Sequence, residues 1–301
     1  KDTTQSLGVL QIYAIIMGSK IEAGADMKLK QLSKKDKAAL IAFLTGDSAG
    51  NSLLDALENP EHTVFGILVN GTLVGAAEIE HDENAFLYVY IVRQFRKKGY
   101  GAMAVKLCEK ELQRDALKSI ETYYLSGDEN AKTFANKLGY AYRFSSSLMR
   151  YNGGAFDLPS LPVRGYVDED YTAAQQLSAR AFHEMRLRVG GFPDSVVQKP
   201  TEAMREAWNA SAKERFVYVL DNEIIGHSHL EGDAIDSVSI KPEVQGRGVG
   251  RLFVKYLCNK ILESGHNSVT LYCVVGNYAR HLYDSLGFQQ EYIEEYAVKT
   301  F

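Results

Sequence analysis

The sequence contains few cysteines, and their spacing matches neither a disulfide framework nor a metal site. Cys108, Cys258 and Cys273 are odd in number, and each stands inside an apolar helix or strand pattern. Thiols in such positions are expected to be buried and reduced, which favours a cytoplasmic protein over a secreted one. The cysteines and histidines also lack the spacing of a zinc site, so we expect no bound metal.

The sequence also lacks a strong charge excess and a long apolar run. A formal net charge of −4 over 301 residues argues against nucleic acid or an anionic membrane as the main partner. The apolar stretch at residues 7–17 is too short to cross a bilayer. We interpret residues 1–26 as an N-terminal extension or leader and exclude them from the fold argument. The remaining length suits two domains of ordinary size.

The rest of the sequence repeats one order of elements. Each half shows a strand, a helical region, a hairpin, a strand, a glycine-rich turn, a helix, a strand, a helix and a closing strand. The hairpins are marked by Asn70-Gly71 and Asp221-Asn222. The first half is predicted to have strands at 28–32, 63–69, 72–80, 86–92, 120–125 and 142–151, and helices at 33–44, 99–114 and 130–138. The second half is predicted to have strands at 163–167, 216–220, 223–231, 235–240, 268–274 and 292–299, and helices at 171–184, 202–212, 248–263 and 278–286.

This repetition predicts two tandem domains of the mixed α/β class. Each is expected to be a mixed, twisted sheet with helices on both faces. We place the domains at residues 27–150 and 163–301. The segment 151–162 contains Gly153-Gly154, Pro159 and Pro162 and is interpreted as a linker.

A glycine-rich turn precedes a helix in each half. Residues 245–250 read Gln-Gly-Arg-Gly-Val-Gly, and residues 96–101 read Arg-Lys-Lys-Gly-Tyr-Gly. Glycines permit left-handed or crowded backbone, so successive N–H groups can converge at the positive end of a helix. The turn therefore predicts a phosphate or pyrophosphate site. It is not a P-loop, which needs Gly-Lys-Ser/Thr, and it follows a hairpin, unlike the dinucleotide fingerprint.

The residues around the second turn carry a family resemblance. Val238-x-Ile240, Gln245-x-x-Gly248-x-Gly250 and Ala279-x-x-Leu282-Tyr283-x-x-x-Gly287-Phe288 resemble the Gcn5-related N-acetyltransferase (GNAT) superfamily. The first half resembles a divergent member through Arg96-x-x-Gly99-x-Gly101 and Ala131-x-x-Phe134-Ala135-x-x-x-Gly139-Tyr140. The resemblance spans residues 27–301 as a tandem pair.

This resemblance implies that acetyl-CoA is the co-substrate. The amides of the turn would hold its pyrophosphate, the strand ending at Ile240 would pair with the pantetheine arm, and Tyr283 would protonate the leaving thiolate. A phenol is a neutral proton donor at pH 7, which suits that role. The expected acetyl-CoA contacts are Val238, Ile240, Gln245, Gly246, Arg247, Gly248, Val249, Gly250, Arg251, Asn277 and Tyr283.

Two departures from the family pattern affect these expectations. The family often has an asparagine three residues before Ala279, where this chain has Gly276, and Asn277 follows one position later. In the first half, Ala135 occupies the position that matches Tyr283 and has no proton to give. The first half is therefore expected to be non-catalytic.

The acceptor amine must lose a proton, so a base is needed near the cleft. The candidates are Glu231, Asp233 and Asp236, and Asp236 stands on the strand expected to flank the acetyl group. Its apolar neighbours, Ile235 and Val238, favour a desolvated carboxylate. The histidines His183, His227 and His229 are further options.

The leading hypothesis is an acetyl-CoA-dependent N-acetyltransferase. The acceptor would be a primary amine of a small molecule or peptide, and it would attack directly in a ternary complex because no Cys–His nucleophile pair is evident. A non-catalytic acyl-CoA-binding or regulatory protein is the alternative. A transferase that uses aminoacyl-tRNA is disfavoured by the acidic charge balance. The acceptor loop at 185–208 and the oligomeric state have no readable signal.

Overall fold

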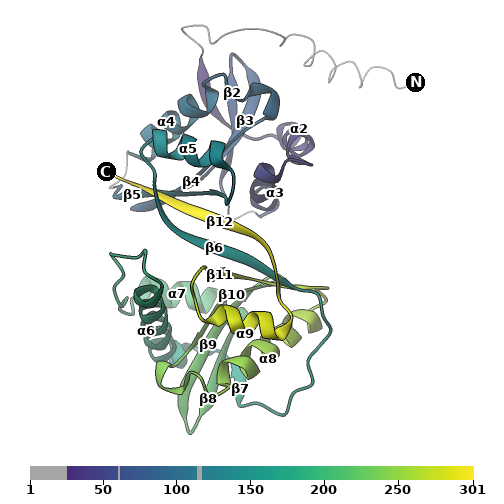
Figure 1. Ribbon diagram of the computed structural model, residues 1–301, viewed down its shortest axis with the longest axis vertical. Coiled ribbons are helices and arrows are strands. Elements are labelled where there is room, and N and C mark those ends of the chain that lie inside the picture. Colours follow the sequence, from purple (N-terminus) through teal and green to yellow (C-terminus); the bar gives the residue numbers. More distant parts are fainter. Residues whose placement is uncertain (1–25, 60–61, 114–116) are drawn as a thin grey trace, which may run out of the picture. The chain divides into compact units, whose positions relative to one another are not determined.

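The computed structural model describes residues 26–59, 62–113 and 117–301, which form two compact units (Figure 1). Unit 1 holds the described residues up to Tyr123 together with 133–141 and 298–301, and unit 2 holds 124–132 and 142–297. The segment interpreted as a leader lies outside the described residues, apart from Asp26.

Unit 1 is built around a mixed sheet. Its strands run in the order β1-β2-β3-β4-β5, and every pair is antiparallel except β4 with β5. Adjacent residues on β4 point to opposite faces: the Tyr90 hydroxyl donates to Phe43 O at the end of α2, whereas Ile91 lies against α4 at Gly101. Helices therefore cover both faces. The elements are β1 (Met27–Gln31), α2 (Lys34–Leu44), α3 (Asn51–Glu58), β2 (Val64–Val69), β3 (Thr72–Glu80), β4 (Asn84–Ile91), α4 (Tyr100–Leu112), β5 (Ser119–Leu125) and α5 (Glu129–Lys137). The end of β5 and the start of α5 belong to unit 2.

Unit 2 has the same design, with strands in the order β12-β6-β11-β10-β9-β8-β7. On β10, Ser239 accepts or donates a hydrogen bond with Ser178 of α6, while the next residue, Ile240, packs in the core cluster with Phe253 of α8. The two helices therefore lie on opposite faces of the sheet. The elements are β6 (Ala141–Tyr151), β7 (Val163–Gly165), α6 (Tyr171–Val189), α7 (Glu202–Ala210), β8 (Arg215–Leu220), β9 (Glu223–Glu231), β10 (Ala234–Ile240), α8 (Val249–Glu263), β11 (Val269–Val274), α9 (Ala279–Leu286) and β12 (Gln289–Thr300).

Local signals in the sequence predicted several of these features. Asn70 and Gly71 both have positive φ, as do Asp221 and Asn222, which is the backbone that a tight two-residue hairpin turn requires. Ser33 caps α2 by accepting from the Asp36 N–H, and the Asp36 carboxylate accepts from the Ser33 N–H. The predicted mixed α/β fold with helices on both faces is confirmed.

The closing strands are placed differently from the expectation that each half keeps its own. Strand β6 pairs antiparallel with β11, from Tyr151↔Val269 to Ser146↔Val274, and from Tyr142 onward it belongs to unit 2. The last residues of β12 belong to unit 1, where Lys299 forms an ion pair with Glu109. The units are therefore interleaved along the chain, because an alternating strand pattern does not specify which strand it pairs with.

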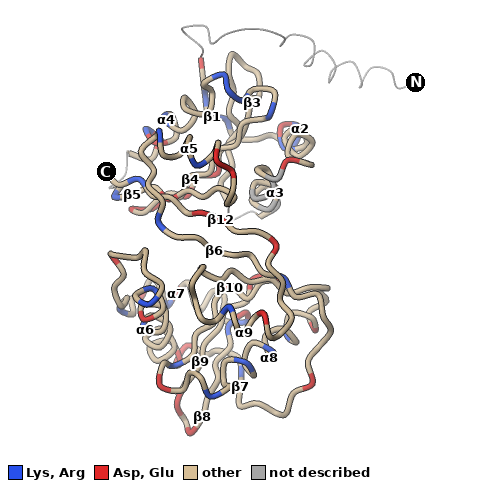
Figure 2. Tube along the Cα trace, in the orientation of Figure 1, with Lys and Arg blue, Asp and Glu red and all other residues tan. Residues whose placement is uncertain are grey.

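Figure 2 shows that basic and acidic residues are interspersed within each unit. No helix among the described residues is long and apolar enough to cross a membrane.

Candidate functional site

A cleft of about 570 Å³ lies in unit 2 where β10 and β11 diverge. These parallel strands pair at Ala234↔Thr270 and then separate, although β10 continues to Ile240 and β11 to Val274. Both strands line the cleft, together with α6, the glycine turn and α9. The two strands therefore splay apart and leave room between them for a ligand.

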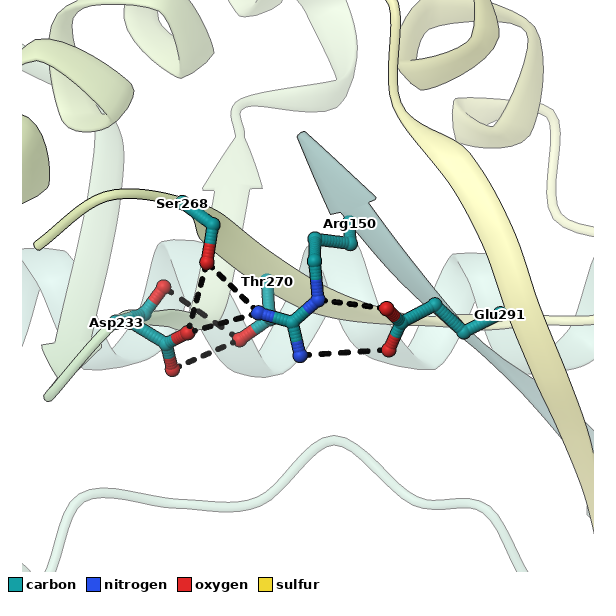
Figure 3. Close-up of polar contacts among 5 residues, drawn as sticks. All are labelled: Arg150, Asp233, Ser268, Thr270 and Glu291. Atoms are coloured by element: carbon teal, nitrogen blue, oxygen red, sulfur yellow. Dashed lines mark hydrogen bonds and ion pairs between the residues drawn. The ribbon is translucent and has the colours of Figure 1, made fainter. Parts of the chain in front are cut away.

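A polar network around Arg150 stabilises the end of the cleft at which β10 and β11 still pair (Figure 3). Arg150 on β6 donates to Asp233 at 3.2 Å, to Ser268 at 2.7 Å and to Glu291 at 2.7 and 3.3 Å. Thr270 donates its hydroxyl to the Asp233 carboxylate at 3.2 Å. The network ties both strands together at the point where they still pair, so their divergence begins at a fixed position.

The glycine turn has the backbone that the sequence predicted at two of its three glycines. Gly246 and Gly248 have φ of +76° and +84°, and Gly248 is the N-cap of α8. No side chain caps this helix start, so its first N–H groups are available to an anion. Gly250 differs, because it lies inside α8 and an added Cβ would meet Ile240 and Leu282 at ordinary distances of 3.5 and 3.8 Å. A single added Cβ at Gly250 is therefore accommodated by the protein itself.

One side chain of the glycine turn holds the turn in place by a hydrogen bond, whereas its two arginines are exposed. Gln245 donates from its amide to Ile240 O at 2.9 Å, which fixes the turn against the end of β10. Arg247 and Arg251 are exposed, and neither takes part in an ion pair with another described residue. Of the expected acetyl-CoA contacts, nine line the cleft: Val238, Ile240, Gln245, Gly246, Gly248, Gly250, Arg251, Asn277 and Tyr283. Arg247 and Val249 are not among the lining residues, and Val249 packs against the core.

Tyr283 lines the cleft from α9 and is otherwise buried. Its ring packs against Phe288 with a centroid separation of 5.8 Å. Burial, with smaller contributions from the nearby Cys273 and Cys258 thiols, raises the pKa of the phenol above its usual value. The hydroxyl therefore keeps its proton at neutral pH and can donate it into the cleft.

Asn277 lies at the start of the same helix. Its side-chain oxygen accepts from the Ala279 N–H at 3.0 Å, and the residue also lines the cleft. The preceding Gly276 has φ of +91°. Asn277 therefore orders the first turn of α9, and so the position of Tyr283, although it stands one residue away from the usual family position.

Asp236 is the extra residue of a bulge in β10. The register with β9 shifts between Ile235↔Leu230 and Ser237↔His229, which leaves Asp236 unpaired in the ladder. Its carboxylate accepts from Nδ1 of His229 at 2.9 Å and lines the cleft. The side chain is 49% exposed, so the expectation of a desolvated carboxylate is wrong. Bulges commonly re-aim a side chain beside an active site.

The other predicted bases lie elsewhere. Glu231 is exposed at the end of β9 and is not among the residues lining the cleft. Asp233 belongs to the Arg150 network. His183 contacts Ser195 at 3.0 Å, and His227 is buried between Ser178 and the ring of Trp208. The structure therefore brings Asp236 and Tyr283 to one cleft and leaves Glu231 outside it.

Sequence reasoning missed a buried carboxylate next to the cleft. Glu294 on β12 is 2% exposed and accepts hydrogen bonds from the hydroxyls of Tyr272 and Tyr296 at 3.3 and 3.0 Å. Tyr272 in turn lines the cleft from β11. The only sequence signal is the alternation of Tyr292, Glu294 and Tyr296, which places the three on one face of a strand.

The matching turn of unit 1 has a similar backbone, but the side chains around it differ from those of unit 2. Gly99 is the N-cap of α4 with φ of +83°, but the Arg96 side chain is engaged with Asp47 at 2.6 Å and Ile91 O at 2.7 Å. Ala135 is buried in place of the phenol. The β3–β4 register runs from Gly75↔Ile91 to Glu80↔Phe86 without a shift, so the bulge that presents Asp236 in unit 2 has no counterpart in that pairing.

One further group in unit 1 bears on the expectation of no metal. Ligand atoms of His62, Glu78 and Glu80 lie within 4.8 Å of one another, and His62 forms an ion pair with Glu78. Glu78 is buried, which raises the pKa of its carboxyl. The His62 imidazole is hydrogen-bonded to this carboxylate, and Glu80 is exposed.

Comparisons with known proteins agree with this geometry. Residues 32–140 match the acetyltransferase (GNAT) family model, and residues 223–298 match the FR47-like protein model. Similar solved structures include a GCN5-related N-acetyltransferase from Sphaerobacter thermophilus, with 18% identity, 91% of this chain and 95% of that chain covered, and a TM-score of 0.65. A tandem GNAT protein from the clavulanic acid biosynthesis pathway has 14% identity, 91% and 98% coverage and a TM-score of 0.59. An acetyltransferase from the GNAT family of Colwellia psychrerythraea has 15% identity, 91% and 100% coverage and a TM-score of 0.54.

The two family matches together cover more than half of the chain, and they fall on the two halves that the sequence repeat defines. These structural likenesses extend over nearly the whole chain and include a tandem protein. The chain therefore belongs to the Gcn5-related N-acetyltransferase superfamily, a family of acyl-CoA-dependent acetyltransferases, as a tandem member.

Proposed function

We propose that the protein transfers an acetyl group from acetyl-CoA to a primary amine of a small molecule or peptide, with catalysis in unit 2. One observation carries the proposal: a single cleft joins an uncapped helix N-terminus at the glycine turn to a buried phenol, Tyr283, and a carboxylate, Asp236. Buried free cysteines support a reducing compartment, and we propose the cytoplasm.

The residues of the cleft fit acetyl-CoA. The first N–H groups of α8 and the guanidiniums of Arg247 and Arg251 suit its phosphates. Beyond Ala234, the edge of β10 that faces β11 has no ladder partner in β11, so its N–H and C=O groups can pair with the amides of the pantetheine arm. Acetyl-CoA supplies the acetyl thioester.

The side chains supply the proton transfers. The carboxylate of Asp236, oriented by His229, accepts a proton from the acceptor ammonium and so frees the amine lone pair. As the C–N bond forms and the C–S bond breaks, Tyr283 gives its proton to the sulfur. The acceptor nitrogen loses a second proton, which returns to the phenol of Tyr283 through solvent. The products are the amide and the free thiol of CoA, and one proton is released.

The test is to measure acetyl-CoA binding by titration calorimetry and acetyl transfer to a panel of primary amines by release of the CoA thiol. Wild-type protein should bind acetyl-CoA and acetylate at least one class of amine. Gly248→Val should weaken binding by about tenfold or more, because the N-cap needs a left-handed backbone that a β-branched residue resists. Gly165→Val, at an exposed glycine of β7 that does not line the cleft, is the matched control, since an added Cβ meets nothing there.

The outcomes separate the competing functions. Binding without turnover across the panel would support the alternative, a non-catalytic acyl-CoA-binding or regulatory protein. Equal affinities of wild type and Gly248→Val would remove the glycine turn from the acetyl-CoA site.

A further inference from the structure

Glu294 is a buried carboxyl group that has no cationic partner among the described residues. Its carboxylate forms no ion pair with any other residue that the structure describes, and its two recorded partners are the hydroxyls of Tyr272 and Tyr296. Burial raises the pKa of the carboxyl, while both phenol donors favour its ionised form. A buried carboxylate without a counter-charge attracts a cation more strongly than an exposed one does.

Tyr272 connects this carboxylate to the cleft. Along β11, Leu271 and Cys273 are buried, whereas Tyr272 between them is 50% exposed and lines the cleft. Its hydroxyl donates to Glu294 and is also hydrogen-bonded to Tyr292. A phenol oxygen both donates and accepts, so it can still accept a hydrogen bond from a group in the cleft. A group that donates to this oxygen is separated from the Glu294 carboxylate only by the Tyr272 hydroxyl, so the carboxylate also attracts it electrostatically.

Aromatic packing holds the carboxylate and its donors in place. Phe144 stacks on Tyr296 with centroids 4.5 Å apart, and Phe192 from the loop after α6 packs on Phe144 at 4.8 Å. Arg143 fastens that loop by donating twice to Asp194, at 2.6 and 2.8 Å. Aromatic rings therefore enclose a carboxyl group that is only 2% exposed, so water screens its charge poorly.

The charges along the cleft are therefore of two kinds. Arg251 lines it at the glycine turn, and Arg188 lines it from α6. Asp236 and Tyr272 line it from β10 and β11, and Tyr272 donates to the buried Glu294 behind it on β12. Basic groups suit the phosphates of acetyl-CoA. The acidic groups suit an acceptor that arrives with a positive charge.

We propose that Tyr272 and Glu294 recognise the acceptor as a primary alkylammonium ion and discriminate against neutral arylamines. The inference rests on the proposed acetyl transfer and names its acceptor class. Tyr272 accepts a hydrogen bond from the ammonium, and Glu294 is a positioning residue that directs the Tyr272 proton away from the cleft. Asp236 then takes the ammonium proton that must be lost before attack.

The test compares n-pentylamine, 2-phenylethylamine and glucosamine, which are charged near neutral pH, with aniline, which is neutral. Glu294→Gln keeps an acceptor for both phenols but removes the charge, and Tyr272→Phe removes the hydroxyl. Either change should raise the KM for the best charged amine about tenfold or more, leave the KM for acetyl-CoA within about twofold, and leave the KM for aniline unchanged. Glu263→Gln, at an exposed ion pair on α8, is the matched control.

Further measurements keep the inference separate from the proposed function. Calorimetric titration of each ammonium without acetyl-CoA reports recognition in the absence of turnover. Ammonium binding that weakens in Glu294→Gln, with no acetylation of any amine, would defeat the proposed function and support the recognition site. Acetylation with equal KM changes for charged amines and aniline, or no change for either, would overturn the recognition site alone. The melting temperature of Glu294→Gln should not fall, since a buried charge has been removed.

Discussion

The Nδ1 atom of His229 lies 2.9 Å from Oδ2 of Asp236, across the bulge that interrupts the β9–β10 ladder. Without the bulge, Asp236 would take its place in the ladder opposite β9. The extra residue instead lets the carboxylate reach the His229 imidazole while it lines the cleft. The two side chains are therefore expected to act as one unit in proton removal.

Asp236→Asn and His229→Gln test this coupling. Each single change should lower the turnover number by about a hundredfold, the lower range for a lost general base. The double variant should be little worse than Asp236→Asn, because groups that act as a unit are not additive. Steady-state kinetics at saturating acetyl-CoA measure all three. Multiplied effects in the double variant would show that His229 acts independently of Asp236.

Tyr283→Phe should separate acid catalysis from binding. The substitution removes the proton but keeps the ring that packs against Phe288, so acetyl-CoA affinity should stay within about twofold while the turnover number falls by about a hundredfold. Tyr142→Phe is the control for loss of an exposed hydroxyl. A turnover number within about twofold of wild type would mean that water or another group protonates the thiolate.

His227 should make the stability of unit 2 depend on pH. Burial, aided by the nearby Arg215 guanidinium and His229, lowers the pKa of the imidazole to about 3. The pKa of the unfolded imidazole is near its ordinary value of 6.5, so between these pH values the unfolded chain binds a proton that the folded chain does not. The free energy of unfolding should therefore decrease as pH falls below about 6.5, by up to about 1.4 kcal/mol per pH unit.

Urea unfolding between pH 4.5 and 7.5 measures this dependence. His227→Gln should be less stable at pH 7.5, because the stack on Trp208 is lost, yet its stability should vary less with pH than that of wild type. His266→Gln removes an exposed imidazole and should keep the wild-type slope. Parallel pH profiles for all three proteins would exclude His227 as the titrating group.

Features with local causes were predictable from the sequence. The backbone at Asn70-Gly71 and Asp221-Asn222 follows from turn chemistry, and the left-handed φ at Gly99 and Gly248 follows from the glycine pattern before each helix. Tyr283 was found through its position after the Ala-x-x-Leu pattern, and the structure places it in the cleft.

Features that depend on distant pairing were not predictable. The bulge at Asp236 exists only relative to β9, and the Glu294–Tyr272 contact joins residues on two strands that are not neighbours in the sheet. The placement of β6 beside β11 likewise depends on a choice of partner that strand alternation leaves open. Glu231 and Asp236 are both acidic residues on adjacent strands, so the sequence does not distinguish them as candidate bases. The register of β10 with β9 decides that Asp236, and not Glu231, lines the cleft.

The last prediction concerns the division of roles between the two turns. Gly99→Val and Gly248→Val impose the same strain at equivalent N-caps, where φ is +83° and +84°. A non-glycine residue in the left-handed region costs about 1–2 kcal/mol, so both variants should melt at somewhat lower temperatures. Only Gly248→Val should abolish acetyl transfer, to below about a twentieth of the wild-type rate, because Arg96 is already engaged with Asp47 and Ala135 has no proton to donate.

The matched pair makes the comparison decisive, since strain alone affects both proteins alike. Acetyl transfer measured at a temperature where both variants remain folded should stay within about twofold of wild type in Gly99→Val. A residual rate near half of wild type in Gly248→Val would show that the turn at 96–101 supports catalysis. In that case solvent would have to supply the proton that Ala135 cannot, and the rate in Gly248→Val should then be insensitive to Tyr283→Phe in the same chain.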